Sequence, residues 1–170
     1  QRNLLKLVAK ALMEHHIPAS CLVLEVTEDT TMREVKNSLQ LMQDLSQQGV
    51  HLALDDFGTG YSSLSYLQKL PVSKVKIDRS FIQGIDTSIE AAELVANICR
   101  MSSMLGKKLV CEGIETQGQL DVLRSLTDIH LYGQGYLFSR PEHAEKAYQT
   151  LLEMEERWLA RRSPDKAYLR

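Results

Sequence analysis

The chain has 170 residues, 44% of them hydrophobic and 25% charged, which is enough for one folded domain with a substantial core. Its net charge of −2 gives no reason to expect a DNA or RNA partner, and no apolar run is long enough to cross a membrane. The three cysteines lack metal-ligand spacing, which favours reduced packing residues in an intracellular protein. No signal peptide is visible, but the chain begins at Gln1 rather than at a methionine, so we expect that upstream sequence is missing.

Hydrophobic periodicity predicts helices and strands in strict alternation along the chain. In chain order we expect helix 3–15, strand 21–26, helix 31–48, strand 50–54, helix 62–68, strand 75–77, helix 88–105, strand 109–111, helix 117–125, strand 129–131 and a last helix from Pro141 past Trp158. The helix at 31–48 is predicted to begin with a capping box, Thr31-Met32-Arg33-Glu34. Five strands that alternate with helices predict an α/β fold of parallel strands joined by right-handed crossovers.

Polar or ionisable groups follow every predicted strand. In chain order they are Glu25 and Glu28, Asp55 and Asp56, Lys76 and Asp78, Glu112 and Glu115, and Gln134. In a barrel of parallel strands the carboxyl ends meet at one face, where catalytic groups lie. A set that is mostly acidic, with one lysine, is hard to explain as loop solvation alone, so we expect a functional site at this face.

The adjacent pair Asp55-Asp56 is the strongest single signal. Two neighbouring carboxylates raise each other's pKa unless a positive group lies between them. An Asx-type turn is the alternative, and it explains one aspartate more readily than two. Together with Glu25 and Glu112, the pair offers oxygen ligands for one or two hard cations such as Mg²⁺ or Mn²⁺. Two such metals about 3.5–4 Å apart can hold the attacking and leaving oxygens of a phosphodiester.

The remaining groups have assignable roles beside such a metal centre. Lys76 can neutralise the carboxylates, orient a nucleophilic water or stabilise phosphate charge. Either Glu112 or Glu115 can act on that water, and Gln134 can hydrogen-bond a metal-bound water or a phosphate oxygen.

Structural alternatives remain open for three of the acidic residues. Glu28 can cap or pair with a neighbouring loop, and Asp78 can form a surface ion pair with Arg79. Glu115 can orient its own loop without touching metal.

Five segments together resemble one protein family. They are Leu24-Glu25-Val26-Thr27-Glu28, Asp55-Asp56-Phe57-Gly58-Thr59-Gly60, Lys76-Ile77-Asp78, Glu112-Gly113-Ile114-Glu115 and Gln134-Gly135-Tyr136. Their order and spacing are similar to those of EAL domains, bacterial phosphodiesterases that hydrolyse cyclic di-GMP to linear pGpG with magnesium or manganese. The resemblance implies a modified (β/α)8 barrel, of which about five βα units are present. It covers residues 1–152, and residues 153–170 are expected to form a helix end and a basic tail.

The resemblance also implies a role for each matching residue. The metal ligands are expected to be Glu25, Asp55, Asp56 and Glu112. Lys76 resembles the lysine near the catalytic water, and Gln134 the glutamine that completes the site. Glu28 resembles the glutamate that steadies the loop after Asp55-Asp56, a loop that gates activity and contributes to dimerisation. Glu115 matches the second glutamate of its motif.

The chain departs from this family in length. A barrel of this type usually needs about 250 residues, and the Glu-Ala-Leu and Asn-x-Ser segments, which carry two further metal ligands, are not found in the 170 residues. A partial barrel has two open edges, which predicts self-association, for example a dimer that exchanges or shares elements. We expect a bacterial cytoplasmic segment of a larger signalling protein. The alternatives are a non-catalytic module that binds cyclic di-GMP or a protein, and an unrelated two-metal barrel hydrolase.

Overall fold

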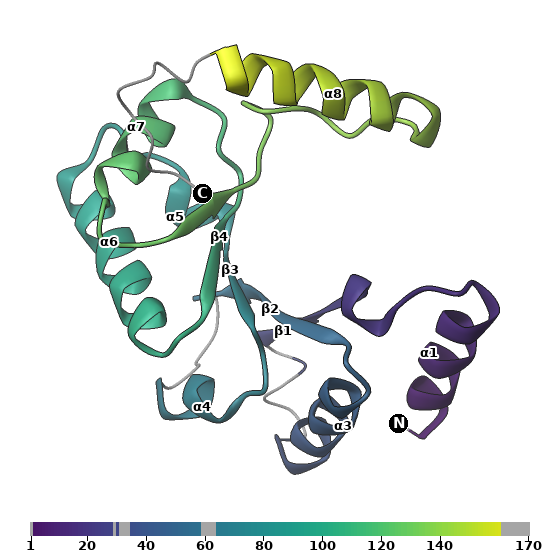
Figure 1. Cartoon of the computed structure of the whole chain (residues 1–170). Coiled ribbons are helices and arrows are strands. Elements are labelled where there is room, and N and C mark those ends of the chain that lie inside the picture. The colour runs from purple at the N-terminus through teal and green to yellow at the C-terminus, as the bar shows by residue number, and fades with distance from the viewer. Residues whose placement is uncertain (1, 29, 31–34, 59–63, 161–170) are drawn as a thin grey trace.

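The computed structural model describes residues 2–28, 30, 35–58 and 64–160 (Figure 1). Its helices are α1 (Arg2–Glu14), the 3₁₀ turn η1 (Ala19–Cys21), α3 (Val35–Gln47), α4 (Leu64–Lys69), α5 (Arg79–Ile82), α6 (Ile89–Met104), α7 (Gln117–Ser125) and α8 (Ala144–Ala160). Its strands are β1 (Val23–Thr27), β2 (His51–Phe57), β3 (Lys74–Ile77), β4 (Lys108–Cys111) and β5 (Leu131–Gly133).

The strands form one parallel sheet in the order β1-β2-β3-β4-β5, so each strand pairs with the next one along the chain. Right-handed crossovers between such sequential parallel strands place the connecting helices on one face of the sheet. The opposite face is then the inner wall of a barrel, as in other (β/α) barrels. The predicted α/β fold with about five βα units of a barrel is confirmed.

The alternation of side chains along the strands separates a core face from an inner face. Leu52 and Leu54 of β2, with Val75 and Ile77 of β3, are at most 1% exposed and belong to the hydrophobic core. Each such buried side chain stabilises the fold by roughly 1.5–3 kcal/mol. Because successive residues of a strand point to opposite faces, Lys76 and the other residues between these core positions face the inside of the barrel wall.

All five predicted strands have different bounds in the structure, β3 and β4 only because each begins one residue earlier. The first strand begins at Val23, because Cys21 ends η1. The second continues to Phe57, so Asp55 and Asp56 lie within the strand rather than after it. The last strand lies two residues later than expected and includes Gly133, a residue that the apolar pattern did not favour. A Cβ at this position would lie 2.8 Å from Ile114 Cδ1, so a larger residue would require the Ile114 side chain to shift.

The helices largely follow the predicted order, with two corrections. The last helix begins at Ala144 and not at Pro141, where the sequence predicts its start. The backbone carbonyl of His143, just before the helix, accepts hydrogen bonds from the N–H groups of Lys146 and Ala147. The short helix α5 was not predicted, because four residues are too few for a periodic pattern. The predicted capping box at 31–34, the start of the predicted helix at 62 and most of the basic tail lie outside the described residues. None of the described helices combines the length and apolarity needed to span a membrane.

Candidate metal centre

Four strands deliver ionisable side chains to the inner face of the sheet. Glu25 of β1, Asp55 of β2 and Lys76 of β3 all occupy positions opposite in parity to the core residues of their strands. Glu112 follows β4 directly, and its N–H donates to Ile77 O of β3 at 3.1 Å. The predicted convergence of strand-end groups on one face is therefore realised for these four residues.

Lys76 lies at the centre of the cluster and is only 8% exposed. Its Nζ lies 2.8 Å from Glu25 Oε2, 2.9 Å from Asp55 Oδ1 and 2.7 Å from Glu112 Oε1. Burial alone would lower the pKa of Lys76, but the nearby carboxylates, Glu112 first, outweigh it and raise the pKa above its ordinary value. The ammonium is thus a permanent positive charge that holds three carboxylates together at neutral pH.

An irregularity in β2 places two neighbouring aspartates at one site. In a regular strand Asp55 and Asp56 would point to opposite faces of the sheet. The pairing of β2 with β3 instead shifts register between Leu54 and Phe57, and Asp56 adopts the left-handed conformation with φ 54°. Bulges of this kind re-aim side chains beside active sites. Such backbone strain in a non-glycine residue is also typical of functional sites.

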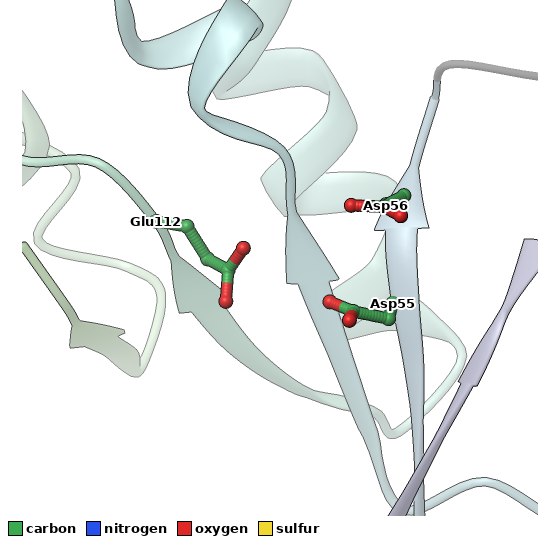
Figure 2. Close-up of side chains that lie close together, drawn as sticks. All are labelled: Asp55, Asp56 and Glu112. Atoms are coloured by element: carbon green, nitrogen blue, oxygen red, sulfur yellow. The ribbon is translucent and has the colours of Figure 1, made fainter.

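As a result, Asp55, Asp56 and Glu112 each place one carboxylate oxygen within 4.8 Å of the others. Figure 2 shows the two aspartates projecting from their strand toward the Glu112 carboxylate. Burial, and next the charge of Asp55, raise the pKa of Asp56 above its usual value. Because burial and the neighbouring charge disfavour the ionised form of Asp56, a cation at this point would stabilise that form.

The donor set fits a hard divalent cation. Mg²⁺ and Mn²⁺ take oxygen ligands, preferably carboxylates, and all three residues offer them. Asp55 Oδ1 is buried and lies 2.9 Å from Lys76 Nζ. A buried carboxylate oxygen is costly unless a charge or a metal compensates it, and here the ammonium does so in part. Three of the four predicted metal ligands are therefore brought within coordinating distance of one another.

Glu25 differs from these three ligands. Its side chain is 50% exposed, and its carboxylate is linked to the cluster by the ion pair with Lys76, whose Nζ donates a hydrogen bond to it. Ala53 of β2, the strand between β1 and β3, pairs with Glu25 in the ladder, and its side chain is only a methyl group. The lysine can therefore reach across β2 to the carboxylate on β1.

Glu28 contacts the chain just after the end of β2. Its side chain is 1% exposed, and Oε2 accepts a hydrogen bond from Gly58 N at 3.0 Å. A contact of this kind restrains the chain just after Asp55-Asp56, although residues 59–63 of the following loop lie outside the described residues.

Glu115 and Gln134 stand apart from the cluster. Both are exposed, and neither side chain makes a hydrogen bond or an ion pair within the described ranges. The backbone N–H of Glu115 donates to Gln119 Oε1 at the start of α7, and the backbone of Gln134 bonds to Cys111 and Ile114. Their predicted roles in catalysis remain predictions.

Asp78 has a structural role, but it caps a helix and, within the described chain, does not form the predicted ion pair with Arg79. Its side chain accepts a hydrogen bond from Ser80 N at 2.9 Å and caps α5. Hydrogen bonding by the Ser80 side chain, and then by the backbone N–H groups of Ser80 and Arg79, lowers the pKa of Asp78. Two residues of α5, Phe81 and Arg79, lie against Gly58 and Gly113, and nothing in a four-residue segment of sequence indicates these contacts.

The family model described as "EAL domain" matches residues 1–141. The chain belongs to the EAL domain family. It is 45% identical over 139 residues to the bifunctional diguanylate cyclase/cyclic di-GMP phosphodiesterase MucR of Pseudomonas aeruginosa, covering 82% of this chain and 20% of MucR. It is 46% identical over 134 residues to the cyclic di-GMP phosphodiesterase NbdA of the same organism, covering 79% of this chain and 17% of NbdA. The chain thus spans about a fifth of the length of these relatives.

Solved structures give the same family. The MucR phosphodiesterase in complex with c-di-GMP aligns with TM-score 0.74 and 44% identity, over 81% of this chain and 55% of that one. The EAL domain of Mycobacterium smegmatis DcpA aligns with TM-score 0.79 and 34% identity, over 88% and 66%. Klebsiella pneumoniae BlrP1 in a manganese/cy-diGMP complex aligns with TM-score 0.75 and 30% identity, over 83% and 36%.

Proposed function

We propose that this chain carries the carboxylate centre of a phosphodiesterase that hydrolyses cyclic di-GMP to linear pGpG. The observation that supports this most directly is the convergence of Asp55, Asp56 and Glu112 within 4.8 Å, in a family whose relatives MucR and NbdA are named as cyclic di-GMP phosphodiesterases. The raised pKa of Asp56, caused by burial and by the charge of Asp55, adds a second reason to place a cation there.

In this proposal Asp55, Asp56 and Glu112 hold Mg²⁺ or Mn²⁺, and Glu25 contributes to a second cation. Bound cations supply Lewis-acid activation of water and neutralise phosphate charge. The chain's own contribution is to fix the positions of the carboxylates on the inner face.

Lys76 provides a fixed positive charge beside the reacting phosphate. Its raised pKa keeps it protonated, so it acts as an electrostatic stabiliser and as a hydrogen-bond donor to a phosphate oxygen or water rather than as a base. Glu112 or Glu115 is the candidate to receive the proton of the attacking water, and Gln134 to hydrogen-bond a phosphate oxygen or a water.

Turnover is tested by incubating the chain with cyclic di-GMP and Mn²⁺ and measuring pGpG by chromatography. Asp55→Asn removes one ligand charge at nearly unchanged volume and should abolish turnover. Asp121→Asn, at an exposed position of α7, is the matched control and should leave turnover unchanged. Equal turnover in the wild type and in Asp55→Asn would exclude the assigned centre.

A second candidate function is a non-catalytic receptor for cyclic di-GMP or a protein partner. The exposed positions of Glu115 and Gln134, outside the carboxylate cluster, favour this alternative. It predicts cyclic di-GMP binding by calorimetry without formation of pGpG at any Mn²⁺ concentration.

Self-association is part of the same proposal. In the described sheet β1 and β5 are the outer strands, and outer strands offer unpaired backbone groups to another chain. We expect a dimer in the cytoplasm of a bacterium, formed by a segment of a larger signalling protein. Sedimentation that finds a stable, folded monomer at all concentrations would contradict the dimer.

A further inference from the structure

The short helix α5 touches the two chain segments that follow the carboxylate ligands. It begins two residues after Ile77, the last residue of β3, which is the strand between β2 and β4. Asp78 caps its first turn, and Ile82, fully buried, anchors it to the core. Both ends of α5 are therefore fixed by contacts that do not involve the carboxylates of Asp55, Asp56 and Glu112.

The first contact is with Gly58, two residues after Asp56. Gly58 has φ 100°, and a Cβ built on it would lie 2.7 Å from both Cε2 and Cζ of Phe81. The Phe81 ring therefore covers the Cα of Gly58, while the N–H of Gly58 donates to Glu28 Oε2. Gly58 is held from two sides, by a hydrogen bond and by an aromatic ring edge.

The second contact is with Gly113, which directly follows Glu112. Gly113 has φ 69°, and a Cβ built on it would overlap the Cβ of Arg79 and lie 3.3 Å from its Cα. The first and third residues of α5 thus pack against the backbone beside both groups of ligands. Only glycine permits this approach and this backbone conformation at the two positions.

The spacing of the carboxylates needs such a restraint. Asp55 and Asp56 come from β2, but Glu112 follows β4, and these strands do not pair with each other. The bulge at Asp56 interrupts the ladder between Leu54 and Phe57. Lys76 draws the Asp55 and Glu112 side chains together, but its ion pairs do not fix the backbone of the bulge that aims Asp56.

We propose that α5 acts as a brace between the two segments, and that Phe81 is a positioning residue for the metal ligands. The inference rests on the proposed metal centre, but the contacts that carry it involve none of the ligand side chains. Phe81 has no metal-ligating atom; it fixes Gly58 and, through Gly58, the bulge that aims Asp56.

Phe81→Ala and Phe81→Leu test the brace, and Phe138→Ala is the matched control. Phe138 is also a half-buried phenylalanine whose ring edge covers a glycine, Gly133, but β5 carries none of the three ligands. Two quantities are measured on the full chain: Mn²⁺ affinity by calorimetry, and the hydrogen-exchange rate of the Gly58 amide by NMR. Denaturation midpoints report any general loss of stability.

We expect Phe81→Ala to weaken Mn²⁺ binding about tenfold, the range typical of residues that orient metal ligands. The same variant should accelerate exchange of the Gly58 amide, and Phe81→Leu should give an intermediate result. Phe138→Ala should lower the denaturation midpoint to a similar degree while leaving Mn²⁺ affinity and Gly58 exchange unchanged. If Phe81→Ala does not fold, the comparison of Phe81→Leu with Phe138→Ala decides.

The brace is overturned if Phe81 variants leave Gly58 exchange unchanged, or if Phe138→Ala alters Mn²⁺ affinity as much as they do. Failure of the proposed function gives a different pattern. Wild type that binds Mn²⁺ without forming pGpG refutes hydrolysis and leaves the brace supported by a Phe81 effect. Wild type that binds no Mn²⁺ refutes both the metal centre and the positioning role of Phe81.

Discussion

Replacing Lys76 with methionine removes the charge at the centre of the carboxylate cluster while keeping most of the side-chain volume. The change leaves Glu25, Asp55 and Glu112 without their shared cation. Breaking a buried ion pair by removing one partner costs roughly 3–5 kcal/mol. The Glu25 side chain is 50% exposed, and an exposed pair contributes only about 0–1 kcal/mol.

The two better buried partners dominate the effect. The side chains of Asp55 and Glu112 are 22% and 18% exposed, so they retain partial hydration and reduce the cost. We therefore expect Lys76→Met to lower the free energy of unfolding by about 2–4 kcal/mol at pH 7 in EDTA. Mn²⁺ should restore part of this loss, because a divalent cation then neutralises the same carboxylates.

Urea denaturation followed by circular dichroism, in EDTA and in Mn²⁺, measures both effects. Lys107→Met is the control, since Lys107 donates to Leu70 O and Val72 O and forms no ion pair with a carboxylate among the described residues. It should destabilise the chain, and Mn²⁺ should stabilise it only as much as it stabilises the wild type, which is less than it stabilises Lys76→Met. The reasoning is refuted if Lys76→Met is as stable as wild type in EDTA, or if Mn²⁺ stabilises the Lys107 variant equally.

The pH dependence has a definite sign. The pKa of Lys76 is raised in the folded chain, so its stabilising contribution is fully present below its ordinary value of 10.5. That contribution is lost as the pH rises from there through the raised pKa of the folded state. The difference in stability between wild type and Lys76→Met should therefore shrink only at strongly alkaline pH.

Three further results are expected. Asp56→Asn should raise stability in EDTA at pH 7 by about 0.5–1 kcal/mol, because it removes a like charge at a left-handed position that asparagine tolerates. Since the pKa of Asp56 is raised, this gain should shrink as pH falls, beginning above the range of an ordinary aspartate, in parallel denaturation curves. Glu28→Ala should cost about 1–3 kcal/mol by leaving the Gly58 N–H unsatisfied, whereas Glu28→Gln keeps an acceptor and should cost less. Thiol labelling of the native chain should modify only the exposed Cys21, and all three cysteines should react in urea.

Much of the site could be predicted because it depends on simple parity. In parallel strands the residues between core positions share one face, so Glu25, Asp55 and Lys76 could be placed together from their spacing alone. Glu112, one residue after β4, likewise lies at a position opposite in parity to the buried residues of that strand. The fold class followed from the same alternation of strands and helices.

What the sequence did not predict depends on contacts between distant segments. The orientation of Asp56 requires a bulge whose partner is β3, and no local pattern signals a shift in register. The bounds of β5 depend on its pairing with β4, which extends to Gly133 opposite Cys111 and which apolarity does not encode. Glu115 and Gln134 lie in motifs similar to those of the family. Their spacing in the sequence does not determine where these exposed side chains lie relative to the carboxylates.

The position of Lys76 explains how the cluster tolerates its own charge. Four carboxylates, including Asp56, face one ammonium, so the ionised site keeps an excess of negative charge. A lysine on an outer strand would reach one neighbour, whereas β3 lies between β2 and β4, and the small Ala53 opens a path to β1. The lysine therefore holds the carboxylates of three strands close enough to coordinate a cation, yet a single charge cannot neutralise them. The order of the strands thus keeps the site assembled and still favourable for a divalent metal.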